Sequence, residues 1–93
     1  MPFEFDAVKD TINRRKHGLP LAIGIELFDG DYLEQVDTRY AYGEARFIAV
    51  GPILTMDDKL HSVTYTWRGA NRRLISVRRA SAREIRIYRD RHA

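Results

Sequence analysis

The chain has 93 residues, of which 44% are apolar and 31% charged, a balance that fits one small folded domain rather than a disordered segment. It has no cysteine, no signal-peptide pattern and no apolar run longer than Leu19–Phe28, which excludes disulfides, a thiol nucleophile and a membrane span. The net charge is +3, and residues 61–93 carry nine Arg against two acidic residues. We therefore expect a single cytoplasmic domain over residues 1–93, with no membrane association.

The first elements in chain order are a strand over residues 3–5, a helix from Asp6 to about His17 and a second helix from Leu21 to Phe28. Asp6 suits the N-cap of the first helix, and Gly18 suits the left-handed residue that follows its last turn. Pro20 suits the first position of the second helix. That helix is apolar on nearly all sides, so it is expected to be buried.

A polar stretch over residues 29–43 follows the second helix. Loops of this length are uncommon in compact domains and usually serve a function or a partner. Asp29-Gly30-Asp31 hints at a calcium loop, but the later ligand positions of such a loop are missing. No metal is therefore expected there.

Three strands joined by short turns are expected over residues 45–54, 60–68 and 72–78. Ser81 and Glu84 form a capping box that begins a closing helix. The order β-α-α-β-β-β-α predicts an α+β domain with helices on one face of a curved antiparallel sheet. The opposite face of the sheet, or its edge, would remain open for a ligand.

The candidates for chemistry are basic residues, which cluster at Arg14–His17, at Arg68 and at Arg78-Arg79. Every cation after residue 60 is Arg, whose planar fork of donors matches phosphate, so a polyanionic partner is indicated, nucleic acid first. Metal-free RNA cleavage needs a base, an acid and cations that stabilise the charged transition state. Crowding among cations lowers the pKa of each, which would bring Lys16 or His17 into a useful range.

Each candidate also has a structural interpretation. Lys16 and His17 are favoured in a last helical turn by the helix dipole alone. Arg68 shares a strand face with threonines and is expected to be solvated. Arg78 and Arg79 point to opposite faces if their strand is straight, so at most one of them then lies in the site.

Three further arginines, Arg15, Arg83 and Arg86, are expected to contact RNA around the site. Arg83 lies in a first helical turn, where the dipole disfavours a cation, which favours a functional reason for it. Glu84 is better explained as the partner in the capping box than as a catalyst. The alternative for all of these basic residues is a solvated basic face without a polyanionic partner.

Several motifs, in order and spacing, resemble the BrnT family of toxins. They are Phe3-Glu4-Phe5-Asp6, Asn13 with Lys16-His17-Gly18, Gly43-Glu44-x-Arg46, Tyr65-Thr66-x-Arg68, and Arg73-Leu74-Ile75-Ser76-x-Arg78-Arg79-Ala80 followed by Glu84 and Tyr88. The resemblance covers nearly the whole chain. Phe5 stands where the family usually has Trp, a change of one aromatic residue for another.

The resemblance implies a RelE-like fold and an endoribonuclease that cleaves RNA, mRNA above all, and thereby stops translation. It implies neutralisation in a hetero-oligomer with a BrnA-like ribbon-helix-helix antitoxin, and contact with operator DNA only through that antitoxin. By position, catalysis would rest on Lys16, His17, Arg68, Arg78 and Arg79. No metal or other cofactor is expected.

Two other functions stay open at this point. A non-catalytic nucleic-acid-binding module would use the arginines for phosphate contacts and Tyr65 or Trp67 for stacking, although alternation places both rings opposite Arg68. A toxin-like repressor subunit would keep the fold and the antitoxin contact after losing catalysis. The basic residues expected to act are all present, which speaks against such a loss.

Overall fold

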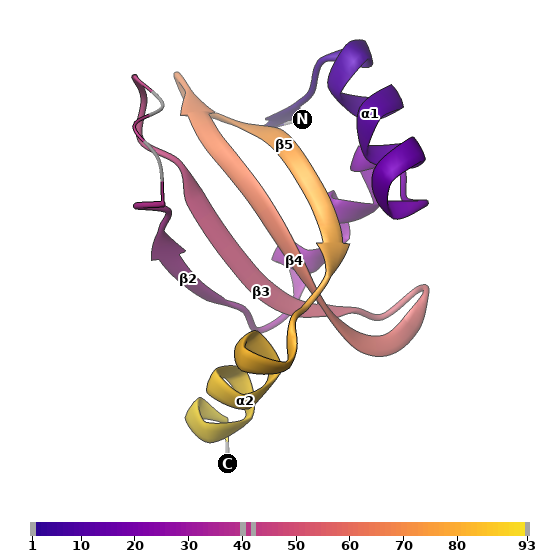
Figure 1. Cartoon of the computed structure of the whole chain (residues 1–93), viewed down its shortest axis with the longest axis vertical. Helices are drawn as coiled ribbons and strands as arrows, with labels where there is room; N and C mark the ends of the chain where they lie inside the picture. Colours follow the sequence, from indigo (N-terminus) through magenta and orange to yellow (C-terminus); the bar gives the residue numbers. More distant parts are fainter. Residues whose placement is uncertain (1, 40, 42, 93) are drawn as a thin grey trace.

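Five strands form one sheet, with two α-helices and one 3₁₀ helix around it (Figure 1). The computed structural model describes residues 2–39, 41 and 43–92, apart from the side chain of Asp58. The elements are β1 (Phe3–Glu4), α1 (Ala7–His17), the 3₁₀ helix η1 (Leu21–Asp29), β2 (Leu33–Val36), β3 (Phe47–Ile53), β4 (Asp57–Arg68), β5 (Asn71–Arg79) and α2 (Ala82–Arg91). The strand order is β1-β5-β4-β3-β2, antiparallel except for the parallel pair of β1 and β5.

The hydrophobic core lies between η1 and one face of the sheet. Leu21 and Leu27 of η1 are fully buried and belong to one cluster with Val63 of β4 and Val77 of β5. Burial of each such side chain stabilises the fold by roughly 1.5–3 kcal/mol. The two layers approach closely at Gly24, where a Cβ atom would lie 2.6 Å from a methyl carbon of Val77. A larger residue at position 24 would therefore push η1 away from the sheet.

The side chain of Asn13 joins helix α1 to the edge of β5. The short strand β1 pairs with β5 only at Arg72 and Arg73, which leaves the later part of that edge without a strand partner. There the buried amide of Asn13 accepts a hydrogen bond from the Val77 N–H at 3.0 Å and donates one to the Val77 carbonyl at 2.9 Å. The same amide nitrogen also donates to the carbonyl of Leu19 at 2.8 Å. Asn13 thus replaces a strand residue and satisfies the exposed edge.

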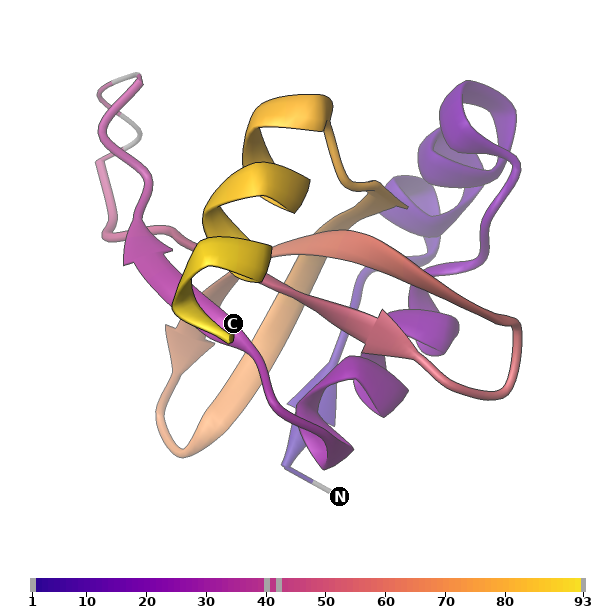
Figure 2. The same ribbon diagram turned by 90° about the horizontal axis from the view of Figure 1, so that it is seen from below.

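The α+β class is confirmed, but the expected placement of all helices on one face is wrong. In Figure 2, η1 and α2 lie on opposite faces of the sheet, and α1 lies at its edge. The helix α2 begins over the face that η1 leaves open. There its capping residue Glu84 also accepts a hydrogen bond from Ser62 of β4. The sheet is mixed rather than purely antiparallel, because β1 joins it in parallel.

Local signals placed the bounds of α1 and the start of α2 correctly, whereas the expected strands differ from the observed ones by up to three residues at an end. The helix after Asp6 ends at His17 with Gly18 in the left-handed region (φ 72°), and Ser81 and Glu84 form the predicted capping box. The second helix is instead a 3₁₀ helix, with Pro20 at its N-cap. The expected loop over residues 29–43 contains β2. None of the helices in the described part of the chain is long and apolar enough to cross a membrane.

Candidate functional site

A basic pocket of about 280 Å³ opens beside α1 on the face of the sheet opposite the core. Its walls come from α1, from the central strands β4 and β5 and from the segment after β2: Lys9, Ile12, Asn13, Lys16, His17, Arg39, Thr64, Ile75, Ser76 and Arg78. Four of these lining residues are Lys or Arg, and none of the described ones is acidic. The pocket therefore suits an anion, and its hydroxyl groups add neutral hydrogen-bonding partners.

The anchor at Asn13 explains why residues far apart in the sequence meet in this pocket. Lys16 and His17 follow Asn13 by three and four residues, so they project from the same side of α1 one turn later. Arg78 follows Val77, the residue that Asn13 binds. The bond between Asn13 and Val77 thus brings the end of α1 next to the end of β5.

The surroundings of His17 disfavour the charged form of its imidazole. Burial, followed by the positive charges of Lys16 and Arg78, lowers the pKa of its imidazole below the usual value of 6.5. Each of these causes disfavours the imidazolium form. An imidazole that stays unprotonated in a pocket for anions can accept a proton from a bound ligand.

Arg78 is held in place from the side of α2. Its NH1 and NH2 groups donate to the two carboxylate oxygens of Glu84 at 2.7 and 3.1 Å, and NH1 also donates to the carbonyl of Arg79 at 3.1 Å. Burial opposes ionisation of Glu84, but the hydrogen bonds from Arg78 and from the Ser81 backbone outweigh it and lower the pKa of the carboxyl. Glu84 is therefore an anion in an ion pair, and only 28% of the Arg78 side chain is exposed.

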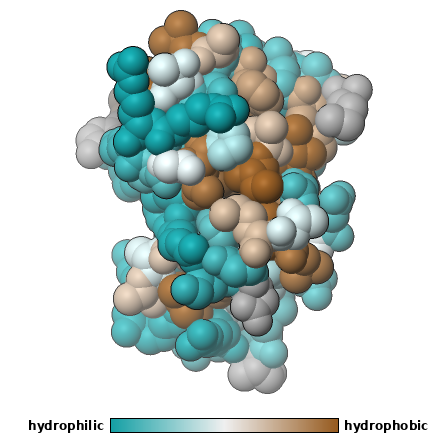
Figure 3. Space-filling model, turned by 90° about the vertical axis from the view of Figure 1, so that its right-hand side faces the viewer, coloured by the Kyte–Doolittle hydropathy of each residue, from teal (hydrophilic) through white to brown (hydrophobic). Residues whose placement is uncertain are grey.

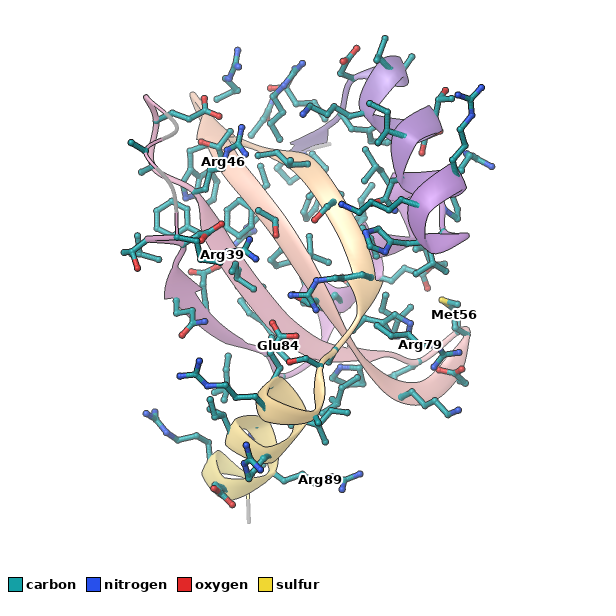
Figure 4. All side chains as sticks on the ribbon, viewed as in Figure 1. Arg39, Arg46, Met56, Arg79, Glu84 and Arg89 are labelled. Carbon is teal, nitrogen blue, oxygen red and sulfur yellow. The ribbon has the colours of Figure 1, made fainter. Side chains whose placement is uncertain are left out.

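Two other arginines expected in the site lie elsewhere. Arg79 points to the other side of β5 and donates to Asp57 at 2.9 Å, near Met56 in Figure 4. Arg68 is paired with Asn71 at the far end of β4, whereas Arg78 is paired with Ser62. These two positions on β4 are six residues apart along the strand, which is about 20 Å. The structure therefore does not bring Arg68 or Arg79 into the basic pocket.

The remaining predicted arginines lie on helix surfaces. Arg15 on α1 and Arg83 and Arg86 on α2 are all exposed. None of the three is among the described residues that line the basic pocket. A ligand would have to extend beyond the pocket to contact them.

The sequence did not single out Arg39, Thr64 or Ser76 as pocket residues. Arg39 belongs to the segment after β2, where its guanidinium binds the buried carboxylate of Asp37 at 2.9 Å. Figure 4 shows its side chain in front of the sheet, on the same side as Glu84. Thr64 and Ser76 face each other across β4 and β5. Alternation along the strands could have placed the two hydroxyls on one face, but no local pattern identifies Arg39.

Apolar side chains are exposed next to the pocket on α1. Val8 and Ile12 lie one helical turn apart and are 64% and 51% exposed, and Ile12 also lines the pocket. Figure 3 views the side of the molecule that carries α1 and shows apolar residues gathered among hydrophilic ones. Among the described residues, no three His, Asp or Glu side chains gather as a group that could hold a metal ion.

Comparisons of the sequence and of the structure with known proteins identify a matching family. The family model described as "Ribonuclease toxin, BrnT, of type II toxin-antitoxin system" matches residues 5–84. The crystal structure of the Brucella abortus ribonuclease toxin BrnT is similar to this chain, with a TM-score of 0.62 and 25% sequence identity. The similarity covers 87% of this chain and 97% of the Brucella protein. No curated protein sequence matches the chain.

Proposed function

This chain belongs to the BrnT family of ribonuclease toxins of type II toxin–antitoxin systems, and on that premise we propose that it is a metal-independent endoribonuclease that cleaves mRNA in the cytoplasm at the basic pocket. The observation that carries this proposal is the meeting of Lys16, His17 and Arg78 in one pocket, with the pKa of His17 lowered. Cleavage of mRNA would stop translation.

The proposed reaction begins at the ribose 2′-hydroxyl. Neutral His17 accepts the 2′-OH proton while the oxygen attacks the adjacent phosphorus atom, and the bond to the 5′-oxygen breaks. The departing 5′-oxygen takes a proton from Lys16, because arginine side chains do not give up protons in this pH range. The products are a 2′,3′-cyclic phosphate and a 5′-hydroxyl end.

The reaction also needs cations that stabilise the charged transition state, and the pocket supplies them. Arg78 donates hydrogen bonds to the phosphate oxygens, where negative charge increases in the transition state, and Lys9 and Arg39 add to the positive potential. Metal independence is proposed because a pocket lined by these cations repels a divalent ion and offers it no carboxylate among the described lining residues.

The partner that neutralises the toxin is proposed to be a BrnA-like ribbon-helix-helix antitoxin. The exposed stripe of Val8 and Ile12 leads directly to Lys16 at the pocket. An amphipathic segment of the antitoxin could cover the two apolar residues and place carboxylates against Lys16 and Arg78. Such a segment would exclude RNA by occupying the pocket, and operator DNA would then be contacted by the antitoxin alone.

The test is cleavage of a defined RNA by the purified protein. We expect cleavage that survives EDTA and leaves 2′,3′-cyclic phosphate ends, together with growth arrest when the protein is expressed without its antitoxin. Cleavage that EDTA abolishes and Mg²⁺ restores would contradict the metal-free mechanism. RNA binding without any cleavage would replace the ribonuclease with a non-catalytic binding module.

A further inference from the structure

We propose that Glu84 is a positioning residue for RNA cleavage, which fixes the Arg78 guanidinium so that its Nε edge faces the scissile phosphate. This inference rests on the proposed function, because it concerns how the same pocket orients its central cation. Nothing in the sequence separates this role from the helix cap, since one carboxylate performs both.

The contacts of Glu84 come from two elements of the fold. One oxygen, Oε1, accepts hydrogen bonds from Arg78 at 2.7 Å and from the backbone N–H of Ser81 at 2.8 Å. The other oxygen, Oε2, accepts from Arg78 at 3.1 Å and from the hydroxyl of Ser62 at 3.3 Å. The carboxylate is therefore held by β4 and by the start of α2, and only 14% of its side chain is exposed.

These contacts decide which part of the guanidinium remains available. Arginine has five N–H donors in a planar group. Both NH1 hydrogens are directed to protein acceptors, one to Glu84 and one to the Arg79 carbonyl, and one NH2 hydrogen is directed to Glu84. Nε and the second NH2 hydrogen have no partner among the described residues. This pair of parallel donors matches two oxygens of a phosphate.

Glu84 lies outside the pocket that Arg78 lines. Arg78 belongs to the basic pocket, whereas Glu84 lines a separate groove between β2, β3 and α2. A carboxylate inside the basic pocket would repel RNA, but from outside it binds the opposite edge of the guanidinium. Glu84 thus orients the cation without facing the substrate.

The experiment compares kinetic constants for a defined RNA between the wild type and Glu84→Gln. The uncharged amide keeps the size of the side chain but loses the bidentate ion pair, so Arg78 samples other orientations. We expect kcat to fall by about 10-fold to 100-fold, as misplacement of a reacting group by about 1 Å does, and KM to change by less than about threefold. A role in capping alone would not lower kcat selectively.

The matched control is Ser81→Ala. It removes the hydroxyl that accepts from the Glu84 N–H, and thus part of the helix cap, but leaves the ion pair and the backbone donor of Ser81 intact. We expect a lower melting temperature with kcat within about twofold of the wild type. A second test places Glu84→Gln in an Arg78→Ala background, where it should cause no further loss of kcat.

The outcomes separate the two proposals. If the wild type cleaves RNA and folded Glu84→Gln has an unchanged kcat, or loses activity equally in the Arg78→Ala background, the positioning role is wrong and the ribonuclease stands. If Glu84→Gln does not fold, Ser62→Ala removes a single contact to the same carboxylate, and an unchanged kcat there also overturns the role. If the wild type does not cleave RNA, both proposals fail.

Discussion

Arg72 and Arg78 lie on the same strand, β5, but their surroundings differ in every respect. The Arg72 guanidinium lies on the core side among aromatic rings, 4.4 Å from the ring centre of Phe28 and 4.7 Å from that of Trp67, and it donates to the Tyr32 hydroxyl at 3.1 Å. Arg78 lies on the opposite side, where the Glu84 carboxylate holds one edge of its guanidinium and the residue lines the basic pocket.

The difference shows that the environment decides what an arginine does. Aromatic faces attract the Arg72 cation and exclude other ligands from it, so its charge is used within the fold. Arg72 also acts on the neighbouring Tyr65 hydroxyl. Burial and the hydrogen bond to Glu34 raise the pKa of Tyr65 to about 12, and Arg72 opposes this rise. Arg78 keeps two donors that have no partner among the described residues. The prediction is that Arg72 serves stability and Arg78 serves chemistry.

The largest effect is expected at His17, which tests the chemical side of this comparison. Substitution His17→Asn removes the proposed base and should lower kcat/KM by about 10²-fold to 10⁴-fold. In the wild type the rate should fall as pH drops through the His17 pKa, which lies below 6.5, because only the neutral ring accepts a proton. The pH–rate profile over about pH 5 to 8 measures this limb, within the range where histidine titrates. The same limb in folded His17→Asn would assign the base to another group.

The second largest fall in kcat is expected at Arg78, which is compared with its neighbour Arg79 on the other side of β5. Arg78→Ala should lower kcat by about 10²-fold to 10³-fold, because it removes donors to charge that develops in the transition state. Its matched control, Arg79→Ala, breaks only an exposed pair with Asp57 and should change kcat by less than about threefold. Single-turnover cleavage of one RNA measures both. Equal losses in the two variants would contradict the assignment of the pocket.

The structural side of the comparison is tested by Arg72→Ala. Loss of the cation from the aromatic cluster should reduce the free energy of unfolding by about 2 kcal/mol, while kcat per folded molecule stays within about twofold of the wild type. Arg73 lies next to Arg72 on β5, and Arg73→Ala breaks a partly exposed pair with Glu4 of β1, so it should cost less than about 1 kcal/mol. Urea denaturation and active-site-normalised kinetics provide the measurements. A large fall in kcat for Arg72→Ala would mean that both sides of β5 serve the reaction.

The smallest effects are expected on the surface of α2. Arg83 and Arg86 are exposed and lie outside the pocket, so Arg83→Ala and Arg86→Ala should weaken RNA binding modestly and leave kcat unchanged. Each should reduce the dependence of log K on log salt concentration by about one unit. Binding titrations across a range of salt concentrations report this slope. An unchanged slope in both would remove α2 from the RNA-binding surface.

Much of the local structure could be predicted because its causes lie within a few residues. Gly18 ends α1 through its backbone preference, and the pair Ser81–Glu84 begins α2 through short-range hydrogen bonds. Asp6 takes the expected N-cap position, although its side chain makes no capping hydrogen bond. The strand β2 could not be predicted, because its four residues, Leu33–Val36, have no strong alternating pattern and gain their structure by pairing with β3. The parallel pairing of β1 with β5 likewise depends on a contact across the whole chain.

The sequence by itself determined the family, the α+β class, and the positions of Lys16, His17 and Arg78 at the ends of their elements. Only the tertiary structure decided which basic residues share a pocket. The Asn13 amide bonds to Val77 from 64 positions away in the chain, which joins the end of α1 to Arg78, and strand register places Arg68 and Arg79 elsewhere. Hydrogen bonds and register at such separations depend on the packed fold, and no pattern within either segment encodes them.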